Sequence, residues 1–284
     1  MNSKPAAIVI RDIDRLSEMR EVEDLQKEIW GVEDREVFPA LAMIPLHEVG
    51  AILIGAFDRN QLVGFVFGFP GWEDGRPIFH SDMLAVKLAY RSLGLGYQLK
   101  LAQRERALAK SIDRITWTFD PLQAVNAHFN FEKLGVVAYQ YKTSFYGETS
   151  SFLHRTGTDR LWVTWLLNSE RVKRRIELSS ASASRPGKPE HVTALIQIDK
   201  DGEPLIGDDE ALDHTVFIEI PADFNRVAEE RIELATRWRE ATRNAFTQAI
   251  NAGYFVEEFY FEEKSGQKIG VYLLTQQPQL STSE

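Results

Sequence analysis

The chain has 284 residues, of which 44% are hydrophobic and 26% charged, and a formal net charge of −9. An acidic chain without a basic stripe is a poor nucleic-acid binder, and no apolar run approaches the roughly 18 residues that span a bilayer. Cysteine is absent, which excludes disulfides, thiolate metal sites and a cysteine nucleophile. The N-terminus also lacks the apolar core of a secretory signal. We therefore expect a cytoplasmic protein with no nucleic-acid or membrane partner.

The first part of the chain alternates strand and helix patterns. In chain order, the sequence predicts a strand at 6–13, a helix at 14–30, a short helix at 38–50 that Pro45 breaks, strands at 51–58, 61–69 and 77–86, a helix at 94–111, a strand at 114–120, a helix at 124–135 closed by Gly135, and strands at 136–146 and 160–167. This order predicts an α/β (α+β) protein with a mixed sheet.

The Ser/Pro-rich stretch "SSASASRPGKPE" (179–190) reads as a linker. The charge balance changes there: 23 basic and 23 acidic residues precede position 179, and 10 basic and 19 acidic residues follow from it. We expect one domain at 1–178 and a smaller α+β region at 191–284, with strands near 191–198, 215–220, 254–262 and 268–275 and a helix at about 225–252.

The order strand, helix, strand in this last region repeats that of residues 77–120. One hypothesis is a degenerate copy of the first half that shapes the acceptor pocket. The alternative is an unrelated appendage or a dimerisation element, which leaves a homodimer open.

The segment "RSLGLG", from Arg91 to Gly96, lies where a strand passes into a helix. A helix start exposes unpaired N–H groups and a partial positive charge, which together bind phosphate. Glycines let an anion approach those N–H groups, and an arginine adds charge-assisted donors. Leu99 stands where a G-x-G-x-x-G fingerprint needs glycine, and no Walker motif is present. The segment predicts a diphosphate site, against the alternative of a plain tight turn.

Two motifs resemble those of the GNAT-type N-acetyltransferases. "VKLAYRSLGLG" (86–96) resembles their acyl-CoA loop, and "NAHFNFEKLGV" (126–136) resembles their Asn-containing helix that ends in "EKLGF". Either motif alone is weak, but their order and spacing are specific, and the resemblance covers residues 5–150. It implies a mixed sheet splayed between strands 77–86 and 114–120, with a bacterial subgroup that carries an extra C-terminal region as the nearest pattern.

The resemblance also implies the binding residues. Acetyl-CoA or another acyl-CoA would be the co-substrate, with no metal. Its amides would bind the backbone of Leu84, Ala85 and Val86, its diphosphate the loop, and its thiol end Asn126 and Phe129. The loop residues are Arg91, Ser92, Leu93, Gly94, Leu95 and Gly96.

The catalytic residues are less defined. The family often has a tyrosine that protonates the departing thiolate, but Phe131 occupies that position here. Tyr146 is our first choice for this acid, ahead of Tyr141. His80, Asp120 and Glu48 are candidates for the base; a sheet histidine and a helix-capping aspartate are the structural alternatives for the first two.

These observations predict an acyl-CoA-dependent N-acyltransferase, in its simplest form an N-acetyltransferase. The acceptor would be the amine of a small molecule, with amino acids as one class, and the amine would attack directly. The alternative function is a non-catalytic acyl-CoA-binding or sensor protein, and Phe131 motivates it.

Overall fold

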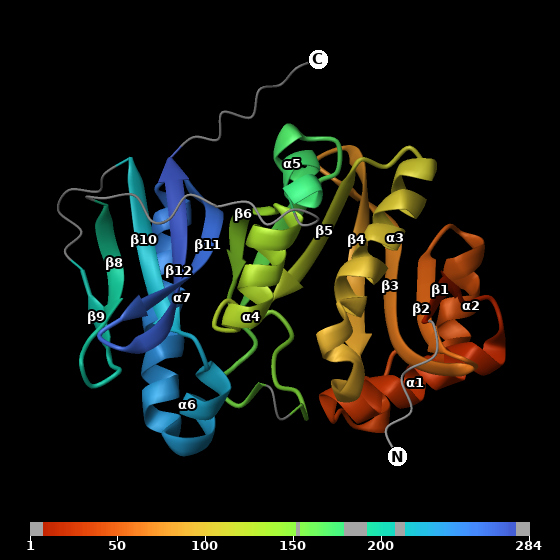
Figure 1. Cartoon of the computed structure of the whole chain (residues 1–284), viewed down its shortest axis with the longest axis horizontal. Coiled ribbons are helices and arrows are strands. Elements are labelled where there is room, and N and C mark those ends of the chain that lie inside the picture. The colour runs from red at the N-terminus through yellow and green to blue at the C-terminus, as the bar shows by residue number, and fades with distance from the viewer. Residues whose placement is uncertain (1–7, 152–153, 179–191, 208–213, 277–284) are drawn as a thin grey trace. The chain divides into compact units, whose positions relative to one another are not determined.

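The computed structural model describes residues 8–151, 154–178, 192–207 and 214–276 (Figure 1). It divides into two compact units. The N-terminal unit comprises residues 1–117 and 149–154, and the C-terminal unit comprises residues 118–148 and 155–284. The predicted linker at 179–190 lies outside the described residues, so the predicted domain boundary stays a prediction. No helix in the described ranges is long and apolar enough to cross a membrane.

The N-terminal unit is built on five strands that follow each other in chain order in the sheet. The first four are antiparallel, and the fifth joins the fourth in parallel. The last two residues of the fifth strand belong to the other unit. The elements are β1 (Val9–Asp12), α1 (Leu16–Trp30), η1 (Asp34–Glu36), α2 (Ala40–Glu48), β2 (Ile52–Asp58), β3 (Gln61–Glu73), β4 (Arg76–Val86), η2 (Leu88–Leu93), α3 (Leu95–Ala109) and β5 (Arg114–Phe119).

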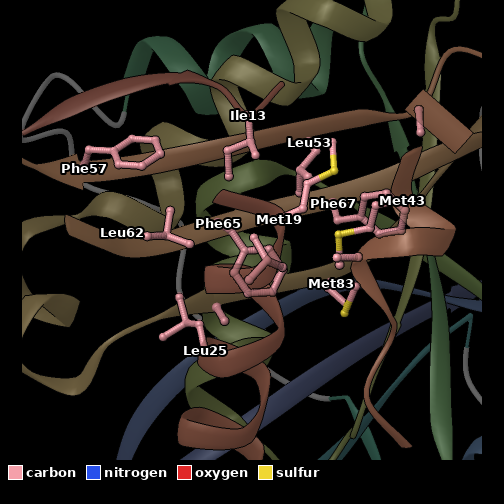
Figure 2. Packing of buried hydrophobic residues seen from close by; sticks show 14 residues of the cluster. Ile13, Met19, Leu25, Met43, Leu53, Phe57, Leu62, Phe65, Phe67 and Met83 are labelled. Carbon is pink, nitrogen blue, oxygen red and sulfur yellow. The ribbon is translucent and has the colours of Figure 1, made fainter. Parts of the chain in front are cut away.

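A hydrophobic core joins α1 and α2 to the strands β2 to β4 of this unit (Figure 2). On α1, Met19, Val22 and Leu25 recur at helical spacing and are buried. They belong to one cluster with Phe65 and Phe67 of β3. This packing fixes the position of the central strands, and β4 in turn carries the candidate site.

The C-terminal unit has a sheet with the order β7-β6-β11-β12-β10-β8-β9. Its neighbouring strands are antiparallel except for β8 and β10. The elements are α4 (Ala124–Ala127), η3 (His128–Leu134, a π-helix), β6 (Val137–Lys142), β7 (Arg160–Leu166), α5 (Glu170–Leu178), β8 (Thr193–Ile198), β9 (Pro204–Ile206), β10 (Thr215–Pro221), α6 (Phe224–Glu230), α7 (Ile232–Asn251), β11 (Tyr254–Lys264) and β12 (Gln267–Gln276).

The mixed α/β fold class is confirmed, but three predicted elements differ. The helix containing Pro45 continues to Glu48, because only one backbone donor is lost and the Pro45 carbonyl still accepts from Val49 N. The strand predicted at 136–146 ends at Lys142, because Ser144 is left-handed and starts a turn. The helix predicted at 225–252 is two helices, separated by the non-helical Arg231, which no glycine or proline marks.

The topology of the last region differs from that of the first strand–helix–strand passage. β4 and β5 pair directly, whereas β12 lies between β10 and β11. The hypothesis of a degenerate copy stays a prediction. Helix α5 and strand β9 were not expected from the sequence.

Candidate functional site

Strands β4 and β5 form a fork within the N-terminal unit. Their register contains two pairs, Phe79 with Ile115 and His80 with Thr116. On its other side β4 stays paired with β3 as far as Val86. In the described part of this unit, the β5 side of Leu84–Val86 therefore has no strand partner. This is the splay expected from the sequence, and it leaves backbone N–H and C=O groups open to a ligand rich in amides.

A β-bulge explains why the strands part at this point. Ser81 and Asp82 of β4 both lie opposite Gly68 of β3, because His80 pairs with Phe69 and Met83 with Phe67. A side chain at Gly68 would come within 2.4 Å of the carbonyl oxygen of His80, so only glycine fits. The extra residue bends β4 directly after its last pair with β5. The regular alternation of side chains along β4 is interrupted here.

The loop after β4 reaches helix α3 through Gly94. Gly94 is left-handed, with φ of 70°, and no side chain caps the first turn of α3. That turn also contains no acidic residue. Residues 91–94 are exposed, and the Arg91 guanidinium donates from Nε to the carbonyl of Val86 at 3.2 Å. The helix start thus offers uncapped N–H groups beside a guanidinium, which is the arrangement that anions bind.

His80 of β4 is a titratable residue at the point where the fork opens. The His80 Nδ1 lies 3.0 Å from Thr116 Oγ1 on β5. Burial, and to a lesser extent the charge of Lys100, lowers the pKa of His80 to about 4. His80 is therefore neutral at pH 7, and so low a pKa makes it a weak base there.

Lys100 of α3 is the residue that sequence reasoning missed. Its side chain is buried, and its Nζ donates to Ser81 Oγ at 2.7 Å and to Gln103 Oε1 at 3.2 Å. Nζ also lies 3.7 Å from the centre of the Trp117 ring. Burial lowers the pKa of this amine well below its usual value. The sequence contained a signal: Lys100 and Gln103 interrupt the stripe of small and apolar residues on the buried face of α3.

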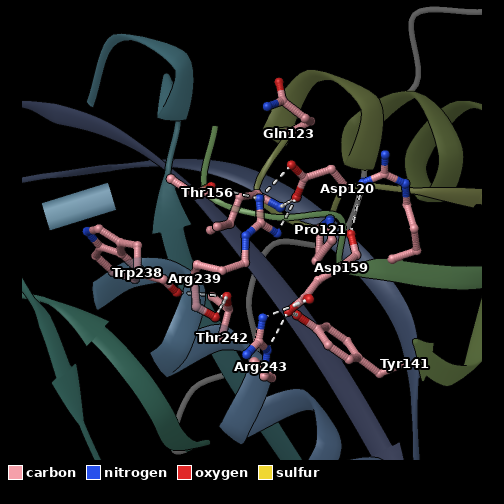
Figure 3. Close-up of polar contacts among 12 residues, drawn as sticks. Asp120, Pro121, Gln123, Tyr141, Thr156, Asp159, Trp238, Arg239, Thr242 and Arg243 are labelled. Atoms are coloured by element: carbon pink, nitrogen blue, oxygen red, sulfur yellow. Dashed lines mark hydrogen bonds and ion pairs between the residues drawn. The ribbon is translucent and has the colours of Figure 1, made fainter. Parts of the chain in front are cut away.

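The other two predicted bases lie in different settings. Glu48 is exposed at the end of α2 in the N-terminal unit. Asp120, in the C-terminal unit, is buried and forms a bidentate ion pair with Arg239, with both distances 2.7 Å (Figure 3). Its Oδ1 also accepts from Leu122 N at 3.0 Å. Both carboxylate oxygens of Asp120 are thus engaged. The bond to Leu122 belongs to the turn before α4, whose N-cap is Gln123 and which has no side-chain cap, so the capping alternative is wrong.

The two tyrosines proposed as acids also differ in setting. Tyr146 lies in the turn after β6, is 47% exposed, and has its hydroxyl 3.2 Å from Thr118 Oγ1. Tyr141 donates to Asp159 Oδ2 at 2.8 Å (Figure 3). Burial, followed by the charge of Asp159, raises the pKa of Tyr141. Of the two, Tyr146 has the hydroxyl that is free of a carboxylate and open to solvent.

The second motif folds as α4 and the π-helix η3, which ends at the left-handed Gly135 as expected. Asn126 is exposed and Phe129 is half-buried. Phe131 is fully buried, with ring centroids 6.2 Å from Phe119 and 5.9 Å from Tyr272. The family's tyrosine position is therefore a core position here, with no hydroxyl to offer. A π-helical turn is often found at functional sites.

The predicted site residues thus divide between the units. The N-terminal unit contains residues 84–86, 91–96 and His80, which follow β4 and its loop. It also contains Glu48, which lies on α2. Asn126, Phe129, Asp120 and Tyr146 belong to the C-terminal unit. Across the described ranges, no group of three or more His, Asp or Glu residues could hold a metal ion.

Residues 16–136 match the family described as Acetyltransferase (GNAT) family. No curated protein matches the sequence significantly.

Among the solved structures that resemble part of the chain are three acetyltransferases. An aminoglycoside 6'-acetyltransferase type Ii is 18% identical, with a TM-score of 0.46, and the match covers 57% of this chain and 99% of that one. The ribosomal-protein-S18-alanine N-acetyltransferase from Escherichia coli is 10% identical, with a TM-score of 0.45 and coverage of 57% and 95%. An aminoglycoside 6'-N-acetyltransferase complexed with coenzyme A is 16% identical, with a TM-score of 0.43 and coverage of 57% and 98%.

Proposed function

We propose that the chain, whose residues 16–136 match the GNAT acetyltransferase family, is an acyl-CoA-dependent N-acyltransferase that acts on the amine of a small molecule. The observation that carries the proposal is the start of α3. It has no side-chain cap and no acid, and Arg91 adjoins it. A diphosphate supplies the negative charge and acceptors that such a helix start lacks.

The open edge of β4 extends the proposed site. From the loop at 91–96, the backbone of Leu84–Val86, which pairs with β3 but has no strand on its β5 side, runs back to the fork at Ser81. A pantetheine arm has amides that can bond to this edge as a strand would. The thioester would then lie where the strands meet. Asn126 and Phe129 stay predictions for the thiol end.

The proposed reaction forms an amide bond from the amine nitrogen to the acyl carbon and breaks the thioester C–S bond. The amine must be neutral to attack, and its proton must leave. His80, Glu48 and Asp120 stay the candidate bases, and His80 is the one that lies at the fork. A backbone N–H of β4 beyond the last β5 pair would stabilise the oxyanion. Tyr146 stays our predicted donor to the departing thiolate.

A thiol-release screen tests the function. Acetyl-, succinyl- and longer acyl-CoA thioesters are each combined with a panel of amines that includes amino acids. We expect release of free CoA with one acyl group and one amine class. Calorimetry with acyl-CoA, and with ATP and NAD as controls, accompanies the screen, because a site built for acyl-CoA should bind it far more tightly than the other two. Equal affinity for ATP would indicate a generic nucleotide site instead.

The second candidate function is a non-catalytic acyl-CoA-binding sensor. It is favoured by Phe131, which is fully buried and cannot donate a proton. Tight binding of acyl-CoA without thiol release from any amine would support the sensor. Absence of both binding and release would contradict both functions.

Tyr146→Phe tests the predicted acid. Loss of a general acid lowers turnover by about 10²–10⁴-fold, whereas loss of one hydrogen bond costs about 0.5–1.5 kcal/mol of stability. We therefore expect turnover to fall far more than melting temperature or CoA affinity. Tyr141→Phe, the variant of our second choice for the acid, is measured in parallel. Turnover within a few-fold of wild type would assign Tyr146 a structural role.

A further inference from the structure

Lys100 is a buried cation without an acidic partner. It is 2% exposed, and the groups around its Nζ are the Ser81 hydroxyl, the Gln103 carbonyl and the Trp117 ring. In the described ranges Lys100 forms no ion pair, and no acidic residue raises its pKa. Buried lysines are ordinarily paired, because an isolated buried charge is very costly. Burial disfavours the charged form of this amine, and an anion bound beside it would favour that form.

Gln103 supplies a second, independent observation. Its side chain is 0% exposed, and among the residues that the structure describes its Nε2 has no hydrogen-bond acceptor. Its Oε1 already accepts from Lys100. The two residues are three apart on α3, so they share one face of the helix. A buried ammonium and a buried amide N–H thus lie side by side, and both lack an acceptor with negative charge.

Both donors lie at the fork of β4 and β5. The last paired residues are His80 and Thr116, and Ser81 and Trp117 follow them on the two strands. Lys100 Nζ contacts both Ser81 and Trp117. If the proposed thioester ends at the fork, the groups attached to the reacting carbon and the attacking nitrogen lie nearest to Lys100.

We propose that Lys100 and Gln103 form a subsite for a carboxylate carried by one of the two substrates. The proposal rests on the proposed N-acyltransferase function. A carboxylate has two oxygens in one plane, so one can accept from Lys100 Nζ and the other from Gln103 Nε2. The shared chemistry has two sources: the distal carboxylate of a dicarboxylic acyl-CoA, or the carboxylate of an amino-acid acceptor.

Steady-state kinetics on the full chain separate these sources. The first arm compares acetyl-CoA with malonyl-, succinyl- and glutaryl-CoA on an amine without a carboxylate. The second arm keeps the acyl group constant and compares an amino acid with its carboxamide. Each arm uses wild type, Lys100→Met, Gln103→Leu, and Lys110→Met as a control for an exposed lysine at the end of the same helix.

In one arm we expect the wild type to prefer the carboxylate-bearing substrate. Lys100→Met should lower its kcat/KM by about 10–100-fold, the range expected for a charged hydrogen bond, and Gln103→Leu by a smaller factor. The kcat/KM of the uncharged partner should stay within about threefold, as should all values for Lys110→Met. Equal losses for charged and uncharged substrates, or no loss in either arm, would overturn the subsite.

Two further measurements keep the outcomes distinct. Melting temperatures establish that each variant is folded, and Gln103→Leu tests the subsite if Lys100→Met is not. Calorimetry compares the affinities of acetyl-CoA and succinyl-CoA for wild type and variants. Wild-type binding of CoA thioesters with no carboxylate preference in either arm would contradict the subsite alone. A wild type that binds no CoA thioester would contradict the proposed function, and the subsite with it.

Discussion

Helices α3 and α7 each connect two strands, and each buries one long cation, but the two cations have different partners. Arg239 of α7 forms a bidentate pair with Asp120 in the C-terminal unit (Figure 3). Burial lowers the pKa of Arg239, but the charge and hydrogen bonds of Asp120 outweigh it and raise that pKa. Lys100 of α3 has only neutral partners, and its pKa is lowered. A buried cation with its own acid stabilises the fold, whereas one without an acid is suited to a ligand.

The N-terminal ends of helices α3 and α6 differ in the same way. Asp223 caps α6 by accepting from Arg226 N at 3.1 Å, so a side chain of the protein satisfies this end. No side chain caps α3, its first turn contains no acidic residue, and the loop before it carries the positively charged Arg91. The first end is complete, and the second is complementary to an anion.

The largest expected effect concerns the uncapped start of α3. Gly94→Glu places a negative charge, and a side chain at a left-handed φ, where the diphosphate is proposed to bind. We expect it to abolish acyl-CoA binding measured by calorimetry. Gly94→Asn is the control, because asparagine tolerates this conformation and adds no charge. Wild-type affinity in Gly94→Glu would refute the loop assignment.

The next effect concerns the two buried cations. Arg239→Met leaves the Asp120 carboxylate buried and unpaired, which should lower the free energy of unfolding by about 3–5 kcal/mol. Lys100→Met removes a buried charge that has no acidic partner among the described residues. It should change the free energy of unfolding by less than about 1 kcal/mol, because the loss of two hydrogen bonds is offset by removal of the cost of burying the amine. Denaturant unfolding measures both. Similar losses in the two variants would contradict the contrast.

The depressed pKa of His80 predicts acid sensitivity near the fork. An unfolded histidine binds a proton at pH 6.5, whereas His80 in the folded protein does so at about 4. The unfolded state therefore binds more protons in this window, and stability falls as pH falls from 6.5 to 4. His80→Asn, whose amide can still reach Thr116, should lose less melting temperature between pH 7 and 5 than wild type. Identical pH profiles would show that His80 is not the source.

The smallest effect concerns the capped start of α6. Asp223→Ala should cost about 1 kcal/mol of stability, the usual contribution of a capping side chain. The affinity for acyl-CoA should not change, because this helix start is not part of the proposed site. A loss of CoA affinity in a folded Asp223→Ala variant would blur the distinction between the two helix starts.

Local signals in the sequence predicted much of this fold. Gly94 and Gly135 mark left-handed positions that other residues rarely adopt, so both helix boundaries followed from residue type. Periodicity identified the strands β2 to β4 and the core face of α1. The partner of Asp120 could not be predicted in this way, because Arg239 lies 119 positions further along the chain. Strand ends suggest a cleft, but a single sequence does not reveal which distant side chain fills the space beside them.

Tyr146 and Lys100 illustrate two other limits. The β-rich composition of 136–146 did not reveal the turn that ends the strand. Ser144 adopts a left-handed conformation there, which is uncommon for serine and is therefore not predicted from the residue type. Lys100 was visible as a polar residue within an apolar stripe, yet helical periodicity alone does not distinguish a long side chain that reaches solvent from one that is buried.

Because of the bulge at Gly68, the opening between β4 and β5 depends on the number of residues in β4. Two residues of β4 lie opposite one residue of β3. This bends β4 away from β5, so β4 and β5 separate without a side chain that holds them apart. Substitutions of the side chains along the gap would then change the chemistry of the site while the opening itself is retained. A one-residue deletion at Ser81 or Asp82 would do the reverse: it would restore an even ladder between β3 and β4, move the following side chains of β4 to the opposite faces of the sheet, and close the gap.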